Sequence, residues 1–203
     1  MKILAIGRNY IDHAKELNNP VPVEPVVFSM PDSALLRNNK DFYYPDFSKD
    51  IHYEVELVVK ISRVGKCIPE EFAHRYYQEI GVGIDFTARD IQAECKKKGL
   101  PWEKAKAFDG AAPLSQFVDK SRFANVNDIN FALDINGHRV QQGNSGDMIF
   151  SIDALISYLS RFFTLKMGDM IYTGTPVGVG PVKIGDRLQA SIEDEVMLDF
   201  AVK

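Results

Sequence analysis

The sequence contains few of the features that mark extracellular, membrane or nucleic-acid-binding proteins. Its only two cysteines, Cys67 and Cys95, cannot form a disulfide framework or a thiolate zinc site. No apolar run approaches the roughly 20 residues of a membrane helix, and the apolar stretch 3–6 meets a glycine and an arginine too early for a signal peptide. The 24 basic and 28 acidic residues are mixed along the chain, giving a net charge of -4 that attracts no polyanion. We therefore expect a cytoplasmic protein without nucleic-acid or membrane partners.

The composition is that of a folded chain with one hydrophobic core. Of the 203 residues, 45% are hydrophobic and 11% are aromatic, which suffices for one substantial core. The sequence contains no internal repeat, low-complexity tract or linker that would divide it. We predict a single domain over residues 1–203.

The first half of the sequence predicts strands alternating with short helices. Residues 3–6 are typical of a strand, and a helix is expected over 10–17. The following segment contains three prolines, which end the helix and favour extended backbone. A short helix beside such a connector suits a lid, which we place at residues 10–25.

The next predicted elements lie between residues 52 and 98. Apolar residues alternate over 52–61, which predicts a strand with one face in the core. Helices are expected over 70–78 and 88–98, the second ending at Gly99, with a strand over 80–86 between them.

From about residue 128 onward the pattern is mainly that of strands. Hairpin or turn signals occur at Asn136-Gly137, Gly168-Asp169 and Gly185-Asp186. One helix is expected over 152–161, with Ser151 as its N-cap.

Three acidic residues are candidates for a metal site. Glu54 and Glu56 are two apart on the predicted strand, so their carboxylates leave the same face about 7 Å apart at Cα. Asp85 lies in an apolar run, where a charge is costly unless it is paired or bound to metal. Oxygen ligands without a His or Cys cluster favour magnesium, with manganese as the alternative. Solvated surface acids are the competing interpretation of each residue taken alone.

Other residues suggest a base and cationic groups. His13 and Glu16 are three apart on the first predicted helix, so the glutamate can orient the imidazole. Lys104 and Lys106 precede a Phe-Asp-Gly sequence, and either ammonium near a metal would stabilise a developing enolate. An ordinary surface role remains open for each of them.

Two further segments are candidates for contacts with an anion. Arg89 and Gln92 share a helix face just after Asp85, where they could grip a substrate carboxylate. The glycine-rich stretch 173–181 lacks the ending of a phosphate-binding loop, so it is either an exposed turn or a site where backbone amides and the Thr175 hydroxyl bind a carboxylate. The run 96–98 of three lysines is interpreted as a solvated helix end.

Taken together, these segments resemble the fumarylacetoacetate hydrolase family, and most closely its single-domain acylpyruvases and oxaloacetate decarboxylases. The resemblance covers nearly the whole chain. It rests on five ordered motifs: GRNYIDHAKEL at 7–17, YEVELVV at 53–59, GIDFTARDIQAECKKKGLPWEKAKAFDG at 83–110, NGHRVQQGNSGDMIFSI at 136–152 and TGTPVGVGP at 173–181.

The resemblance implies roles for particular residues, matched by motif. The metal ligands would be Glu54, Glu56 and Asp85. The lid dyad would be His13 and Glu16, and the active-site lysine would be Lys106, because it directly precedes the Ala-Phe-Asp that fits the family pattern. The substrate would contact four further residues: Arg8, Arg89, Gln92 and Thr175.

The resemblance also implies a fold and a reaction. The fold would be mixed α+β and mainly β, a β-sandwich roll with short peripheral helices, usually a homodimer. The chain lacks the extra N-terminal domain of larger fumarylacetoacetases and the duplicated half of bifunctional isomerase/decarboxylases, so those activities are less expected. The expected reaction is magnesium-dependent cleavage of small 2-oxo acids through a metal-bound pyruvate enolate, as acylpyruvate hydrolysis, oxaloacetate decarboxylation or both.

Three alternatives remain open at this point. The same enolate would serve an oxaloacetate keto-enol tautomerase, and a 2-hydroxyhepta-2,4-diene-1,7-dioate isomerase-type enzyme is related to it. A non-catalytic module that binds a metal and a 2-oxo acid belongs to another class. The presence of His13, Glu16 and Lys106 argues against the module, because a binder needs no base.

Overall fold

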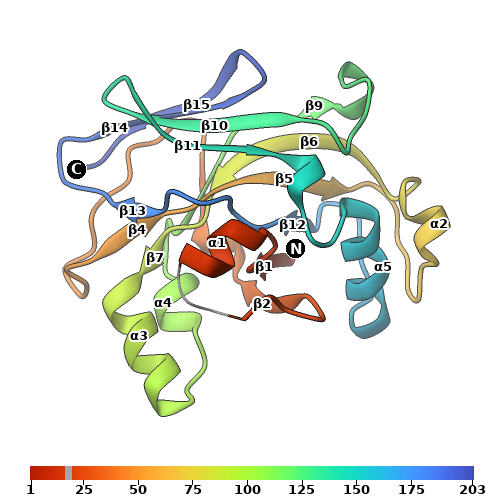
Figure 1. Ribbon diagram of the computed structural model, residues 1–203, viewed down its shortest axis with the longest axis horizontal. Helices are drawn as coiled ribbons and strands as arrows, with labels where there is room; N and C mark the ends of the chain where they lie inside the picture. The colour runs from red at the N-terminus through yellow and green to blue at the C-terminus, as the bar shows by residue number, and fades with distance from the viewer. Residues whose placement is uncertain (17–19) are drawn as a thin grey trace.

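The computed structural model describes residues 1–16 and 20–203 and consists mainly of strands, with short helices at the periphery (Figure 1). The expectation of a mixed, mainly β fold is therefore confirmed. None of the helices in the described ranges has the length and apolar character needed to span a bilayer.

The strands in the described ranges form three sheets. The largest, in spatial order, contains β2 (Val26–Met30), β1 (Ile3–Gly7), β12 (Met170–Tyr172), β5 (Val55–Ile61), β6 (Tyr77–Ile84), β8 (Ala112–Leu114) and β3 (Leu35–Arg37), with β9 (Val118–Asp119) paired to β6. The second contains β11 (His138–Asn144), β10 (Asn130–Ile135), β14 (Arg187–Ile192) and β15 (Glu195–Ala201). The third contains β13 (Gly180–Pro181), β4 (Ile51–Tyr53) and β7 (Thr87–Ala88).

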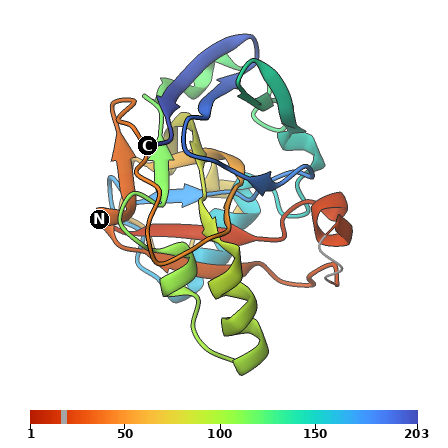
Figure 2. The ribbon, with the colours of Figure 1, turned by 90° about the vertical axis from the view of Figure 1, so that its left-hand side faces the viewer.

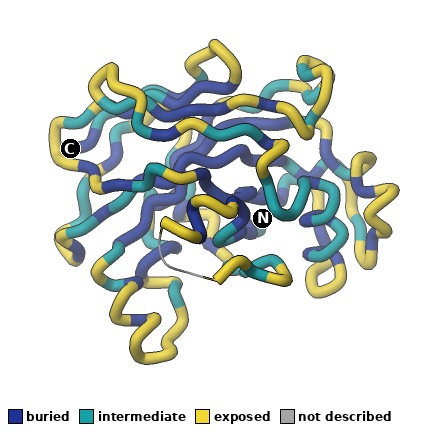
Figure 3. Tube along the Cα trace, in the orientation of Figure 1, coloured by how far each residue is buried: buried dark blue, intermediate teal, exposed yellow. Residues whose placement is uncertain are grey.

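The helices lie outside the sheets. They are α1 (Ile11–Glu16), α2 (Glu70–Ala73), α3 (Arg89–Lys98), α4 (Glu103–Lys106) and α5 (Ile152–Phe162), with 3-10 turns at Asp32–Ala34, Lys120–Arg122 and Ser145–Asp147. In Figures 1 and 2, α3 and α4 lie side by side and project from the sheets. Figure 3 shows that the strands carry most of the buried residues, whereas the far end of α3 is exposed.

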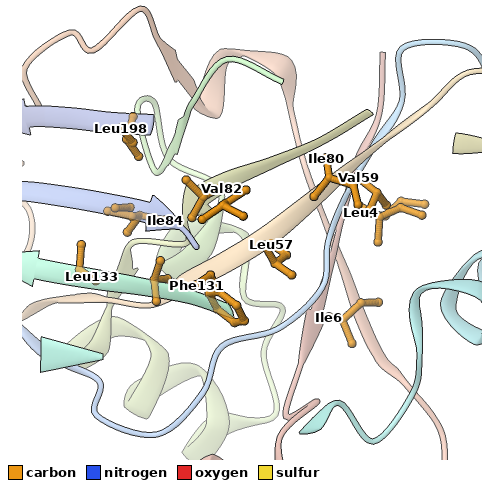
Figure 4. Packing of buried hydrophobic residues seen from close by; sticks show 14 of the residues in the cluster. Leu4, Ile6, Leu57, Val59, Ile80, Val82, Ile84, Phe131, Leu133 and Leu198 are labelled. Atoms are coloured by element: carbon orange, nitrogen blue, oxygen red, sulfur yellow. The ribbon is translucent and has the colours of Figure 1, made fainter. Parts of the chain in front are cut away.

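The core forms on both faces of β5. Leu57 and Val59 belong to the main apolar cluster, which includes Val82 and Phe131 and is seen in Figure 4. Val58 points the other way into a second buried cluster. The expectation that only one face of this strand is core was therefore wrong, because sheet and loop segments cover both faces.

Most turn and cap signals in the sequence were correct. Asn136 and Gly137 have φ of 53° and 79° and connect β10 to β11, as the hairpin signal predicts. Gly99 ends α3 with φ of 66°, a conformation that favours glycine. Ser151 caps α5, its Oγ accepting a hydrogen bond from the amide of Ala154 at 3.2 Å.

Two predicted helices differ from the structure. The helix expected over 70–78 ends at Ala73, because Tyr77 pairs with Ile61 and begins β6. Long-range ladder formation and burial of Tyr77 thus override the local helical pattern. The helix expected over 10–17 is observed as α1, which begins at Ile11 and is described as far as Glu16. Residues 17–19, which belong to the predicted lid, lie outside the described residues.

Candidate active site

Three buried carboxylates meet where β5 begins and β6 ends. The two strands are antiparallel, with Glu56 opposite Gly83 and Val55 opposite Ile84. This register places Asp85, which directly follows β6, beside Glu54 and Glu56. One oxygen from each carboxylate lies within 4.8 Å of the others, and all three residues are buried.

The backbone around these acids differs in detail from the sequence prediction. Glu54 lies in the break between β4 and β5 rather than within one continuous strand, and Asp85 lies just beyond β6. The amide of Asp85 donates to the carbonyl of Glu54 at 2.8 Å, which holds the two residues together. The convergence of the acids therefore comes from the strand ends and their cross-connection.

Two cations neutralise part of this negative charge. The Lys106 ammonium, itself buried, donates to Glu54 Oε2 at 2.7 Å and to Asp85 Oδ2 at 2.6 Å. Arg89 forms an ion pair with the other oxygen of Glu54. Lys104, the alternative considered from sequence, is exposed on the same short helix. The geometry thus supports the choice of Lys106.

The three acids have different electrostatic environments. Burial opposes ionisation of Glu54, but the charges of Lys106 and Arg89 outweigh it and hold the pKa of Glu54 well below its usual range. Burial and the neighbouring Asp85 raise the pKa of Glu56. Burial, opposed by Lys106 but assisted by Glu54, raises the pKa of Asp85 to about 7. Glu54 is thus the most strongly compensated of the three.

Glu56 is held by the glycine-rich loop that follows β12. Its Oε2 accepts a hydrogen bond from the amide of Gly174 at 2.8 Å. Gly174 has φ of 101°, and a Cβ there would lie 2.6 Å from Cβ of Asn9. Asn9 in turn donates to the carbonyl of Thr173 at 2.8 Å. An amide of the stretch 173–181 therefore binds a carboxylate, which is that of Glu56, and binding of a ligand carboxylate by this stretch stays a prediction.

Gln141 is a supporting residue that the sequence reasoning missed. Its side-chain amide donates to Thr175 Oγ1 at 2.9 Å and to the carbonyl of Pro176 at 3.0 Å, while its Oε1 accepts from the amide of Val55 at 2.9 Å. Thr175 accepts this bond and donates none to the described residues, so its hydroxyl proton is available to a ligand. Gln141 lies within a motif quoted above, but only its burial distinguishes it from the exposed residues beside it on β11.

His13 and Glu16 form the predicted pair on α1. His13 Nδ1 lies 3.2 Å from Glu16 Oε2, and the imidazole is buried while the carboxylate is partly exposed. The other oxygen of Glu16 accepts from the amide of Gly178 at 3.0 Å. The dyad is thereby tied to the same glycine-rich loop that holds Glu56.

A narrow cleft of about 30 Å³ joins these groups. Every predicted site residue except Glu16 and Asp85 lines it, and both of those contact a lining residue. Arg89 also donates to Gln92 Oε1 at 2.9 Å within the cleft wall. Lys96 lines the cleft as well. The whole run 96–98 is exposed at the end of α3, as expected of a solvated helix end.

The residues present fit a hard divalent cation. All three candidate ligands are carboxylates, the donor type that magnesium and manganese prefer. Asp85 Oδ1 is buried and has no hydrogen-bond partner among the described residues. An unpartnered buried carboxylate oxygen is costly, and a bound cation would satisfy it.

The fold and the site together define the class of protein. It is a mainly β protein whose buried carboxylates are suited to a hard metal ion and lie beside a histidine that can act as an acid or base. The chain belongs to the fumarylacetoacetate hydrolase family, whose model, described as "Fumarylacetoacetate (FAA) hydrolase C-terminal", matches residues 2–202. The resemblance inferred from the five motifs is therefore confirmed.

Named relatives and a solved structure are similar over almost the entire chain. Mouse "Oxaloacetate tautomerase FAHD1, mitochondrial" is 43% identical over 201 residues, covering 99% of this chain and 91% of that protein. "Oxaloacetate tautomerase YcgM" of Escherichia coli K12 is 42% identical over 193 residues, covering 95% of this chain and 88% of that protein. The crystal structure of fumarylpyruvate hydrolase from Pseudomonas aeruginosa with Mn²⁺ and pyruvate has a TM-score of 0.94 at 35% sequence identity. The match covers 100% of this chain and 89% of that chain.

Proposed function

We propose that this protein is an oxaloacetate keto-enol tautomerase that uses magnesium or manganese. The observation that carries the proposal is the buried cluster of Glu54, Glu56 and Asp85, with the Lys106 ammonium bridging two of the acids and His13 on the same cleft. The relatives named as oxaloacetate tautomerases favour tautomerisation over cleavage. This reverses the order expected from sequence, where cleavage came first.

The three carboxylates would hold the cation, and Asp85 Oδ1 is the oxygen that most needs one. When bound, such a cation supplies Lewis-acid stabilisation of negative charge on the oxygens of a 2-oxo acid, worth several kcal/mol. Arg89 and Lys106 add positive charge to the same cleft, so a small carboxylate anion is the ligand that it favours.

His13 is the candidate base. Glu16 favours the imidazole tautomer with a proton on Nδ1, which leaves the lone pair of Nε2 free. In the keto-to-enol direction, a proton leaves C3 of oxaloacetate and the 2-oxo oxygen gains one from solvent water, and His13 then returns its proton to solvent, so that no net proton is gained or lost. His13 would accept the C3 proton, and the free hydroxyl proton of Thr175 would hydrogen-bond to the substrate.

Substrate access requires movement of a lining element. The cleft volume of about 30 Å³ is far below the roughly 300–1,000 Å³ typical of ligand sites. Because α1 is short and carries His13, we retain residues 10–25 as the proposed lid. Opening of α1 would uncover the carboxylates, and closure would return His13 to them.

Cleavage is the second candidate. The similarity to fumarylpyruvate hydrolase supports acylpyruvate hydrolysis, in which water activated by His13 would attack the distal carbonyl. Oxaloacetate decarboxylation would use the same cationic groups without an activated water.

A single assay distinguishes these functions. Oxaloacetate and acetylpyruvate are each incubated with the purified protein and magnesium, and enol absorbance and pyruvate are followed together. We expect accelerated interconversion of the enol and keto forms of oxaloacetate without matching pyruvate. Pyruvate release at the same rate would contradict the proposal and favour cleavage, and no turnover of either compound would favour the non-catalytic binding module.

A further inference from the structure

Lys96 is a cleft residue without an assigned role. It lies four residues after Gln92 and seven after Arg89 on α3, so the three side chains share one helix face. All three line the cleft. Lys98, in the same turn, instead pairs with Glu94 on the exposed surface.

The aromatic ring of Trp102 positions the Lys96 ammonium. Nζ of Lys96 lies 5.5 Å from the centroid of this ring, within the range of a cation-π contact. Trp102 also lines the cleft and packs against Phe28, with ring centroids 6.1 Å apart. The ammonium is thus held against Trp102 at the exposed side of the cleft, and Lys96 as a whole is exposed. We call this side of the cleft, lined by Lys96, Trp102 and Arg8, its mouth.

Two cations at the mouth, Lys96 and Arg8, form no ion pair with the described residues. Lys106 and Arg89 are paired with the acids, whereas neither Lys96 nor Arg8 has an acidic partner within 4.0 Å anywhere in the described ranges. Partial burial and the charges of Arg89 and Arg8 outweigh the opposing charge of Glu54 and lower the pKa of Lys96. Arg8 has φ of 62°, an uncommon conformation for a residue other than glycine, directly after β1. Like charges gathered in this way favour an anionic ligand.

We infer that Lys96, with Arg8 beside it, binds the distal carboxylate of the substrate and makes the site selective for 2-oxo dicarboxylates over 2-oxo monocarboxylates. The inference rests on the proposed function and narrows its substrate class. The inner groups of the cleft, Arg89, Lys106 and Thr175, would contact the 2-oxo acid end that both classes share. Only a dicarboxylate presents a second charge for the mouth.

Oxaloacetate and pyruvate test this directly, because they differ by one carboxylate on C3. Trp102 is the only tryptophan of the sequence and touches Lys96, so its fluorescence reports binding at the mouth. Stopped-flow titration of the magnesium-loaded protein gives a dissociation constant for each ligand without relying on turnover. Lys96→Met should weaken oxaloacetate binding by about tenfold, because it removes one charge-assisted hydrogen bond whose strength is reduced by exposure to solvent. Pyruvate binding should weaken by less than about twofold, because pyruvate has no second carboxylate.

Two matched variants separate this role from a general loss of charge or structure. Lys97→Met removes the same charge from the exposed neighbouring position and should leave both dissociation constants unchanged. Lys96→Arg keeps the charge and should retain most of the preference for oxaloacetate. An equal effect of Lys96→Met on both ligands, or none, would overturn the inference.

The unaltered protein and the Lys96→Met variant also distinguish failure of the proposed reaction from failure of the proposed dicarboxylate subsite. If the Lys96→Met protein loses its preference but the unaltered protein does not accelerate enol-keto interconversion, the dicarboxylate subsite stands and the proposed reaction fails. If interconversion is accelerated while the preference is insensitive to Lys96, the reaction stands and the subsite fails.

Discussion

Asp85 illustrates how single residues define this site. It is almost completely buried, one of its oxygens is paired with Lys106, and the other has no partner among the described residues. Burying a carboxylate in this way is unfavourable for folding, so the position is better explained by ligand binding than by stability. Lys106 compensates only part of the charge, because it is shared with Glu54.

His13 gives the sharpest prediction at the residue scale. If it is the base, His13→Ala should reduce proton transfer at C3, and with it tautomerisation, by roughly 10²- to 10⁴-fold. Hydrolysis of acylpyruvates should fall similarly, whereas any oxaloacetate decarboxylation should be spared much more, because it needs no activated water. Steady-state rates for the three reactions check this. Equal losses in all three would contradict the role of His13 as a base.

At the element scale, the glycine-rich loop connects the dyad to the carboxylates. The amide of Gly174 donates to Glu56 and that of Gly178 donates to Glu16. One loop therefore holds a residue of the carboxylate cluster and a residue of the His13–Glu16 dyad. Gln141 on β11 holds the same loop through Thr175 and Pro176. Distortion of the loop should therefore affect both the base and the metal ligands.

Gly174→Ala tests this coupling. The added Cβ would meet Asn9 at 2.6 Å, so we expect a loss of stability and a weaker grip of the loop on Glu56, seen as reduced affinity for Mn²⁺. Gly168→Ala is the control: Gly168 has a similarly left-handed φ of 84°, but a Cβ there meets nothing within 4 Å. It should show only the conformational penalty, about 1 kcal/mol, in thermal unfolding. Equal Mn²⁺ affinity in both variants would refute the coupling.

The turn before β12 predicts a pH dependence of stability. Asp169 accepts hydrogen bonds from the amides of Lys2 at 2.7 Å and Lys166 at 2.8 Å, and also pairs with the Lys2 ammonium. Burial opposes ionisation, but these donors outweigh it and lower the pKa of Asp169. A lowered carboxyl pKa stabilises the fold above the unfolded pKa of about 3.9, and this contribution is lost as the pH falls through the folded pKa.

Asp169→Asn should therefore lower the free energy of unfolding by about 1–3 kcal/mol at pH 7, and the difference from the unaltered protein should shrink below about pH 4. Urea unfolding at several pH values measures both quantities. Asp186→Asn is the matched control, since Asp186 accepts from the amide of Lys183 in the other Gly-Asp turn but is more exposed. Asp186→Asn should lower the free energy of unfolding by less than Asp169→Asn does. An equal decrease in the two variants would contradict the argument that burial strengthens the contribution of Asp169.

The sequence predicted the elements and residues whose signals are local. The cap at Ser151, the turn at Asn136-Gly137 and the unusual acid Asp85 each have a short-range chemical cause. The hydrogen bond of Glu56 to Gly174 spans 118 positions, and nothing in either segment specifies the other. The start of β6 at Tyr77 was missed for the same reason, because its pairing partner Ile61 lies elsewhere in the chain.

At the scale of the whole molecule, the assembly and its location remain predictions. The family resemblance implies a homodimer, and we expect light scattering after size exclusion to give twice the monomer mass at all micromolar concentrations. A monomer mass throughout would refute this expectation. The cytoplasmic location expected from the sequence is checked by cell fractionation.

The central claim is that Glu54, Glu56 and Asp85 together hold one hard divalent cation. The most direct test is Mn²⁺ binding, measured by calorimetry and by the electron paramagnetic resonance of free Mn²⁺. The unaltered protein should bind one Mn²⁺ per chain, and Asp85→Asn should weaken binding at least tenfold. Asp194→Asn, in the exposed turn between β14 and β15, should bind like the unaltered protein. Failure of the unaltered protein to bind Mn²⁺, or undiminished binding by Asp85→Asn, would contradict the account.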